Sequence, residues 1–172
     1  MSCAEQEAER RRTRGLSAVF TVTAARSEAD VEELSGLFRE YGRTPHVAAC
    51  VAGFDGEIAG LPGAYAGPRG AMLIARVEGR PAGCVALRPL DATTAELKRL
   101  YVRPEFRGRH IGEALTTAIA DAARARAFVR LRLDTLPSMT SARALYARLG
   151  FTEIPPYVAT PIPGVSYLEL HL

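Results

Sequence analysis

The sequence predicts an α/β domain whose mixed, mostly antiparallel sheet is covered by helices. Apolar runs at 71–77, 82–88 and 95–102 are joined by short turns, which favours an antiparallel meander. An amphipathic helix then separates the last run from an alternating strand at 128–134. A strand, crossover helix and strand in this order are typical of parallel pairing.

Length and composition favour one cytoplasmic domain. At 172 residues the chain can bury a core, and no apolar run approaches the ~20 residues of a membrane-spanning helix. Residues 1–15 mix acidic and basic side chains without an apolar stripe, so we expect a disordered arm before a single domain over residues 16–172. Three widely spaced cysteines fit neither a disulfide framework nor a zinc site, which favours a reducing cytoplasm and no metal.

Positive charge is concentrated in one segment. Residues 98–148 hold eleven Lys or Arg against four acids, a balance of +7, whereas the whole chain carries +3. A bound polyanion would explain this asymmetry, and a solvated arginine-rich helix face would explain it equally well. We expect no nucleic-acid partner, because exposed aromatic side chains are not interleaved with the arginines.

The first elements are a strand and a helix. Residues 16–25 are rich in valine, phenylalanine and threonine and predict a strand. Ser27, followed by Asp30 three residues later, has the pattern of an N-cap, and the apolar spacing predicts a helix over 28–41.

A weaker helix and a loop come before the meander. The helix is expected between His46 and Ile58, and residues 61–70 predict a loop because they hold two prolines and three glycines. Tyr65, in the middle of this loop, is either a surface side chain or part of a substrate pocket.

The strand at 95–102 runs into a turn and a helix start rich in glycine and arginine. The first N–H groups of a helix lack partners and carry partial positive charge, so this position suits a phosphate. Gly108 and Gly112 would let an anion approach the backbone, and Arg107 and Arg109 add charge and donors. A turn with solvated arginines is the alternative.

The last third of the chain continues the alternation of strands and helices. After the helix that begins near Arg109 and the strand at 128–134, apolar spacing predicts a second helix over 139–149. Short strands are expected at 151–154 and 165–172.

Two motifs resemble the GCN5-related N-acetyltransferase (GNAT) superfamily, and the resemblance spans residues 18–172. The first is the Arg/Gln-x-x-Gly-x-Gly/Ala signature that grips the pyrophosphate of acetyl-CoA, occupied here by residues 107–112, with His110 where a glycine is usual. Met139 stands where the second motif usually has an asparagine. That second motif is formed by Ala142, Leu145, Tyr146, Gly150 and Phe151.

The resemblance implies a GNAT fold of about six or seven strands flanked by about four helices. It implies acetyl-CoA as cosubstrate and transfer of an acetyl group to a primary amine of a small molecule or peptide, by direct attack in a ternary complex. The main chain of Leu100, Tyr101 and Val102 would pair with pantetheine like an extra strand, and a bulge in this strand would separate it from its parallel neighbour. The phosphates would contact Arg107, Gly108, Arg109, His110, Ile111, Gly112, Glu113 and Ala114.

Two side chains are candidates for the chemistry. Glu96 lies four residues before Leu100, so strand alternation places it on the pantetheine face as a general base. Tyr146 is the candidate acid for the leaving thiolate, by its position in the second motif. The alternatives are a solvent-facing glutamate paired with an arginine, and a core tyrosine.

The acceptor and the assembly stay open. Residues 15–97 hold ten acids against seven arginines, which favours a cationic amine. A non-catalytic acyl-CoA-binding or sensing module of the same fold is the alternative function. No membrane partner is expected, and a homodimer is left open.

Overall fold

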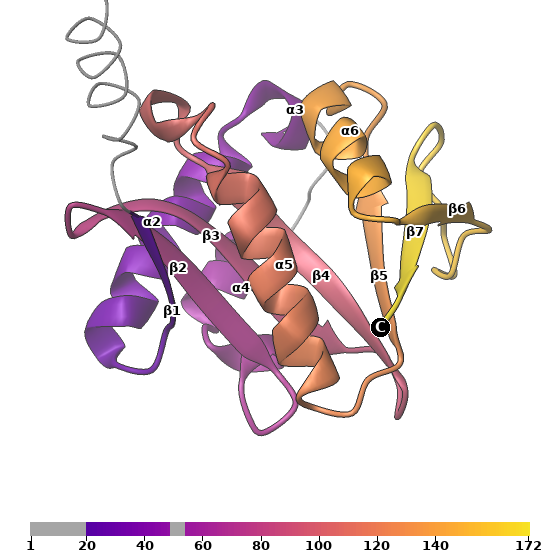
Figure 1. Ribbon diagram of the computed structural model, residues 1–172, viewed down its shortest axis with the longest axis horizontal. Helices are drawn as coiled ribbons and strands as arrows, with labels where there is room; N and C mark the ends of the chain where they lie inside the picture. The colour runs from indigo at the N-terminus through magenta and orange to yellow at the C-terminus, as the bar shows by residue number, and fades with distance from the viewer. Residues whose placement is uncertain (1–19, 49–53) are drawn as a thin grey trace, which may run out of the picture.

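A computed structural model describes residues 20–48 and 54–172 (Figure 1). The predicted arm over residues 1–15 and the first part of the predicted strand at 16–25 lie outside the described residues, as do Cys3 and Cys50.

The described residues form one seven-stranded sheet in the order β1-β2-β3-β4-β5-β7-β6. Every pairing is antiparallel except that of β4 with β5. The strands are β1 Phe20–Ala24, β2 Ala71–Val77, β3 Arg80–Pro89, β4 Thr94–Val102, β5 Arg130–Thr135, β6 Thr152–Ile154 and β7 Ser166–His171. The predicted mixed, mostly antiparallel α/β class is therefore confirmed.

Helices cover both faces of the sheet, with α5 on the near face in Figure 1 and α2 behind it. The α-helices are α2 Glu28–Gly42, α3 Pro45–Ala48, α4 Phe54–Ala59, α5 Ile111–Arg124 and α6 Thr140–Arg148. Single 3₁₀ turns occupy Gly63–Tyr65 and Pro104–Phe106.

Two hydrophobic cores lie on the two faces. The α5 side holds Val85, Leu97, Leu115, Ile119 and Leu131 among its buried residues. The α2 side holds a smaller cluster that includes Leu34, Leu37, Phe38, Ile74 and Cys84. Both faces of the central strands are thus buried, which explains why their sequences are continuous apolar runs instead of alternating ones.

The predicted boundaries need three corrections. The single weak helix expected between His46 and Ile58 is two short helices, α3 and α4, with residues 49–53 between them outside the described residues. The loop at 61–70 contains one 3₁₀ turn. The hairpin turn between β2 and β3 is shortened to Glu78 and Gly79, whose positive φ values of 50° and 78° match the mirror-image turn that fits strand twist.

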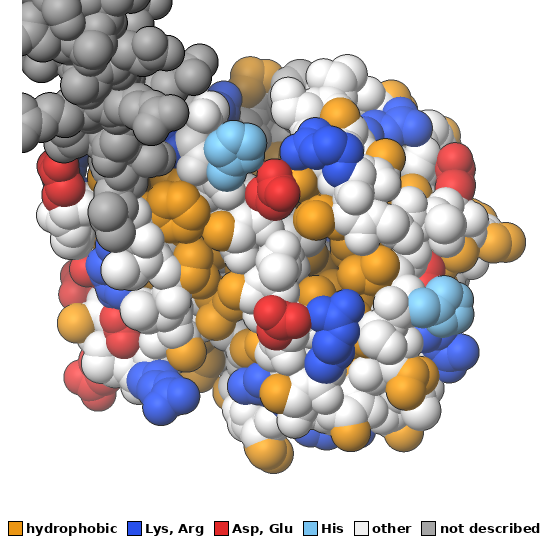
Figure 2. Space-filling model, in the orientation of Figure 1, with side chains coloured by type: hydrophobic (Ala, Val, Ile, Leu, Met, Phe, Trp, Pro, Cys, Tyr) orange, Lys and Arg blue, Asp and Glu red, His pale blue; other side chains and the backbone are white. Residues whose placement is uncertain are grey.

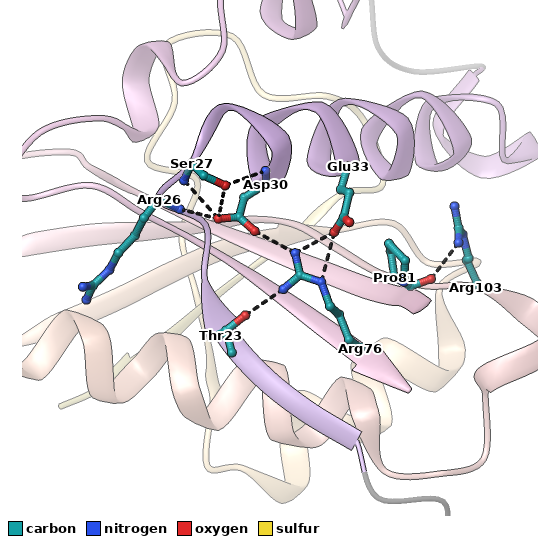
Figure 3. Close-up of polar contacts among 8 residues, drawn as sticks. All are labelled: Thr23, Arg26, Ser27, Asp30, Glu33, Arg76, Pro81 and Arg103. Carbon is teal, nitrogen blue, oxygen red and sulfur yellow. Dashed lines mark hydrogen bonds and ion pairs between the residues drawn. The ribbon is translucent and has the colours of Figure 1, made fainter. Parts of the chain in front are cut away.

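The predicted cap of α2 is confirmed and is tied to the sheet. The Ser27 side chain accepts from the Asp30 N–H at 3.1 Å, and the Asp30 carboxylate accepts in return from the Ser27 N–H at 3.0 Å. Arg76 of β2 then bridges the carboxylates of Asp30 and Glu33 at 2.7 and 2.6 Å and donates to Thr23 of β1 (Figure 3). This cluster joins α2, β1 and β2 at the edge of the sheet.

Within the described part of the chain, no helix combines the length and the hydropathy needed to cross a bilayer.

The cap carboxylate should make stability sensitive to acid. The backbone N–H groups of Ser27 and Arg26, the Ser27 hydroxyl and the Arg76 guanidinium hold the pKa of Asp30 well below its usual range. A lowered pKa in the folded state contributes stability above the ordinary pKa of about 4, and that stability is lost as the pH falls below it.

We therefore expect Asp30→Asn to lower the melting temperature at pH 7 and the difference from wild type to shrink as the pH falls from about 5 to about 2. Thermal unfolding followed by circular dichroism at a series of pH values measures this. Glu153→Gln, at an exposed position of β6, is the matched control. A constant difference for Asp30→Asn across the series would contradict the assignment.

Candidate functional site

The strands β4 and β5 separate partway along their length. They pair in parallel for three residues and the pairing ends at Glu96. Just beyond, the register between β3 and β4 shifts. Cys84 pairs with Tyr101 and Ala86 pairs with Lys98, so β4 has one residue more than β3 between these pairs. Arg99 lies in this bulge with a left-handed φ of 60°. The bulge implied by the family resemblance is therefore present.

A groove of about 680 Å³ lies between β4, the start of α5 and the start of α6. Figure 2 shows acidic, basic and histidine side chains gathered where α5 begins. The groove is lined on the β4 and α5 side by Leu100, Tyr101, Val102, Arg107, Gly108, His110, Ile111, Gly112 and Glu113. The opposite wall includes Tyr41, Met139, Ala142, Leu145 and Arg148.

A smaller cavity of about 80 Å³ lies in the gap between β4 and β5. Its lining shares Tyr41, Leu100, Met139 and Ala142 with the groove, so the two hollows adjoin. Most of the remaining wall is apolar. Its polar members are Lys98, Arg99, Asp134 and Thr135.

The start of α5 presents backbone donors to the groove. Among the described residues, the N–H groups of residues 110–113 make no hydrogen bond, and no side chain caps the helix. The first amide with an acceptor is that of Ala114, which donates to the His110 carbonyl at 3.0 Å. Four unsatisfied donors at a helix N-terminus are a suitable site for an anion.

Local backbone conformation explains the residues at this turn. Arg107, at φ −66° and ψ 162°, is followed by Gly108 at φ 76°, which is the pattern of a type II turn that favours glycine at this position. His110 has a left-handed φ of 60°, and its side chain is 83% exposed. Glycine adopts this conformation at little cost, which fits the glycine that is usual at this position in the signature the sequence resembles.

Charged groups beside these donors are partly paired. The Nε of Arg107 donates to the Val102 carbonyl at 3.0 Å, which holds the guanidinium beside the groove. The Glu113 carboxylate lies 3.4 Å from His110 Nδ1 and 3.6 Å from an Arg148 nitrogen. Arg148 thus offsets the negative charge of Glu113.

Not every residue predicted to bind the cofactor reaches the groove. Arg109 and Ala114 do not line it, whereas the others predicted for this role do. The Arg109 guanidinium instead lies 5.7 Å from the centre of the Phe106 ring. Arg148 and Tyr41 also line the groove, and the sequence did not indicate this because their helices approach the groove only through tertiary packing.

Tyr146 lines the smaller cavity. Its side chain is 5% exposed, and its ring packs against Phe151 with 5.4 Å between ring centres. Burial raises the pKa of the phenol, so it stays protonated at neutral pH. Within the described residues its hydroxyl makes no hydrogen bond, which leaves the proton available to a ligand in the cavity.

Glu96 is buried behind other side chains and lines neither hollow. Only 2% of it is exposed. Its Oε2 accepts from Arg88 Nε at 2.6 Å, its Oε1 accepts from the Tyr157 hydroxyl at 2.8 Å, and Lys98 Nζ lies 3.7 Å away. Burial and the Glu96 carboxylate raise the pKa of Tyr157, so this contact is a neutral phenol on a carboxylate.

The alternation argument for Glu96 is wrong, because the bulge exchanges the faces of β4. Ala95 and Leu97 belong to the core on the α5 side, so Glu96 between them faces the α2 side. Beyond the extra residue, Tyr101 joins the α2-side core and Leu100 packs on the α5 side. The side chains of Glu96 and Leu100 therefore lie on opposite faces of the sheet.

Tyr65 is buried, so it is not a surface side chain, and it lines neither the groove nor the smaller cavity. It is 4% exposed, packs edge-on against Phe38 with 6.1 Å between ring centres, and donates to Glu57 at 2.6 Å. Desolvation by burial raises the pKa of its phenol, and the bond to Glu57 adds to this effect. The loop position of Tyr65 did not indicate this burial, because the contacts that bury it come from α2 and α4.

Two ion pairs that the sequence did not indicate lie around the smaller cavity. Lys98 Nζ is 2.6 Å from Asp134 across the gap between β4 and β5. Arg99 binds Glu57 of α4 through two nitrogens. The partners are 36 and 42 residues apart in the sequence, so no local sequence pattern predicts these pairs.

Metal-binding side chains do not cluster in the described residues. No three of the histidine, cysteine, aspartate and glutamate side chains there lie close enough together to hold an ion.

Comparisons with known proteins agree with this geometry. Residues 62–151 match the family model described as "Acetyltransferase (GNAT) family". An uncharacterised N-acetyltransferase of Schizosaccharomyces pombe is 34% identical over 155 residues, which cover 89% of this chain and 95% of that protein.

Solved structures show the same fold. An acetyltransferase from Streptococcus agalactiae has a TM-score of 0.75 at 22% identity, covering 89% of this chain and 98% of that one. The PaiA N-acetyltransferase of Thermoplasma acidophilum in complex with coenzyme A has a TM-score of 0.67 at 18% identity, covering 90% and 99%. The chain belongs to the acetyltransferase (GNAT) family.

Proposed function

We propose that this protein is an acetyl-CoA-dependent N-acetyltransferase that acts on a primary amine by direct attack in a ternary complex. The observation that carries the proposal is the start of α5, where the N–H groups of residues 110–113 have no acceptor among the described residues and belong to residues that line the groove. A diphosphate would satisfy these donors and the partial positive charge of the helix end. Acetyl-CoA supplies both that diphosphate and the acyl thioester.

The backbone of β4 beyond the bulge would hold the pantetheine. Past Glu96 the described residues give β4 no partner strand on its β5 side. An extended ligand can pair with such a strand edge through main-chain hydrogen bonds. The N–H of Leu100 or Val102 is the proposed donor to the thioester carbonyl oxygen.

Tyr146 is the proposed acid for the leaving thiol. Its buried, neutral phenol lines the cavity next to Leu100. No acyl-enzyme step is proposed, because Cys84 is fully buried and burial raises the pKa of its thiol, which opposes the thiolate that such a step requires.

The acceptor must lose a proton before it attacks, since an alkylammonium has a pKa of about 10. Glu96 is the proposed base, and because it lies behind Lys98 and Tyr157 it would act through a water. Asp134 is a rival candidate. It lines the smaller cavity, where its carboxylate could bind the ammonium directly.

A non-catalytic acyl-CoA sensor is the second candidate function. One observation favours it: Glu96 is covered by Tyr157 and lines neither hollow. A sensor would keep the groove and would lack turnover.

Thiol release separates the two functions. We expect free CoA to appear from acetyl-CoA only when an amine is added, in a panel of amino acids, polyamines, arylalkylamines and short peptides. Binding of CoA, measured by calorimetry, should occur without any amine. Tight CoA binding with no release above the hydrolytic background for any amine would leave the sensor.

Gly112 tests the phosphate site. A Cβ at this position would meet Leu145 and Val102 at ordinary contact distances of 3.6 and 3.8 Å, so small side chains fit. We expect Gly112→Asp to weaken CoA binding on the order of 100-fold, because a carboxylate would lie within about 5 Å of the diphosphate. Gly112→Asn, which has the same shape without the charge, is the control. Equal affinities for the two variants would count against a diphosphate at this position.

The pH profile distinguishes the two candidate bases. With Glu96 as base, kcat/KM of the wild type falls as the pH is lowered, and Glu96→Gln reduces the rate about 100-fold and removes that acid limb. Asp134→Asn should then raise KM for the amine and retain the decrease of kcat/KM at low pH. The reverse pattern would assign the base to Asp134.

A further inference from the structure

We infer that Glu57 of α4 is a positioning residue, which holds the β4 bulge in its shape by clamping Arg99. The inference rests on the proposed acetyl transfer, since the bulge affects chemistry only if the neighbouring Leu100 amide serves the thioester. Glu57 lines neither hollow, so it would act through Arg99 and not by touching a ligand.

The clamp is a closed set of contacts. Arg99 Nε donates to Glu57 Oε1 at 2.9 Å, and a second guanidinium nitrogen bonds the other carboxylate oxygen. The guanidinium carbon lies 4.5 Å from the centre of the Phe54 ring, and the Tyr65 hydroxyl donates to Glu57 at 2.6 Å. Two-point arginine–carboxylate pairs fix orientation as well as distance.

Charge and burial make this pair more than a surface contact. The side chains of Arg99 and Glu57 are 11% and 26% exposed. Burial acts to raise the pKa of Glu57, yet the hydrogen bonds from Arg99 and Tyr65 outweigh it and leave the pKa lowered. The carboxylate therefore stays ionised at neutral pH, where the clamp is complete.

The backbone conformation at Arg99 is one that the clamp would stabilise. Arg99 has a left-handed φ of 60°, a conformation that is unfavourable for a residue with a Cβ and that surrounding contacts can stabilise. The Arg99 carbonyl also accepts from Cys84 Sγ at 3.5 Å. Without the clamp, Arg99 could leave its left-handed conformation and turn the Leu100 amide away from the gap.

A second pair supplies a matched control. Arg103, after the end of β4, binds Glu40 of α2 through Nε at 2.9 Å and a terminal nitrogen at 2.7 Å. This pair has the same chemistry and also joins β4 to the α2 side, but it lies outside the bulge.

The experiment compares Glu57→Gln with Glu40→Gln. We expect Glu57→Gln to lower kcat by about 10- to 100-fold, with the CoA dissociation constant within about 2-fold of wild type. Glu40→Gln should keep kcat within about 2-fold of wild type. Hydrogen exchange, resolved to single residues over 97–103, should be faster in Glu57→Gln than in wild type at residues 98–101 and unchanged at the other positions. The melting temperatures of both variants show whether a decrease in kcat is caused by a decrease in stability.

Several outcomes would overturn the clamp. They are an unchanged kcat in Glu57→Gln, an equal loss in Glu40→Gln, or unaltered exchange across the bulge. If the wild type releases no thiol with any amine, the proposed transfer fails, and the exchange comparison alone then decides whether Glu57 holds the bulge. Arg99→Gly tests the backbone separately, since glycine adopts the left-handed conformation without a clamp.

Discussion

The divergence of β4 from β5 beyond Glu96 is the constraint on which the site depends. A central strand of a sheet normally satisfies its N–H and C=O groups on both sides. After three parallel pairs the bulge at Arg99 turns β4 away, and its backbone over residues 100–102 faces a gap instead of a strand. The groove and the smaller cavity both open on this stretch, through Leu100. Among the described residues, an interior strand edge is thereby left without a partner strand.

Five of the acidic side chains of residues 15–97 are paired with arginines within the protein. The acids of residues 15–97 suggested a cationic acceptor when they were counted along the chain. In the fold, Asp30 and Glu33 are bound by Arg76, and Glu40, Glu57 and Glu96 are bound by Arg103, Arg99 and Arg88. The excess of acids thus describes how α2 and α4 are joined to the sheet, and it no longer argues for a particular amine.

Sequence reasoning worked where the signal is local. The capping residues Ser27 and Asp30, the strand and helix order, and the glycine-rich start of α5 follow from short-range rules, and the structure agrees with them. It failed where one inserted residue or a distant partner decides the outcome. The bulge at Arg99 reversed the face assigned to Glu96, and contacts from α2 and α4 buried Tyr65. Neither effect leaves a periodic pattern in the sequence.

The central claim is that the amides at the start of α5 bind a diphosphate and so bring a thioester to the gap beside Leu100. A crystal structure of the complex with acetyl-CoA tests it most directly. The account predicts diphosphate oxygens within hydrogen-bonding distance of the N–H groups of residues 110–113, with the pantetheine along residues 100–102. A diphosphate bound elsewhere, with these four amides still facing solvent, would contradict it.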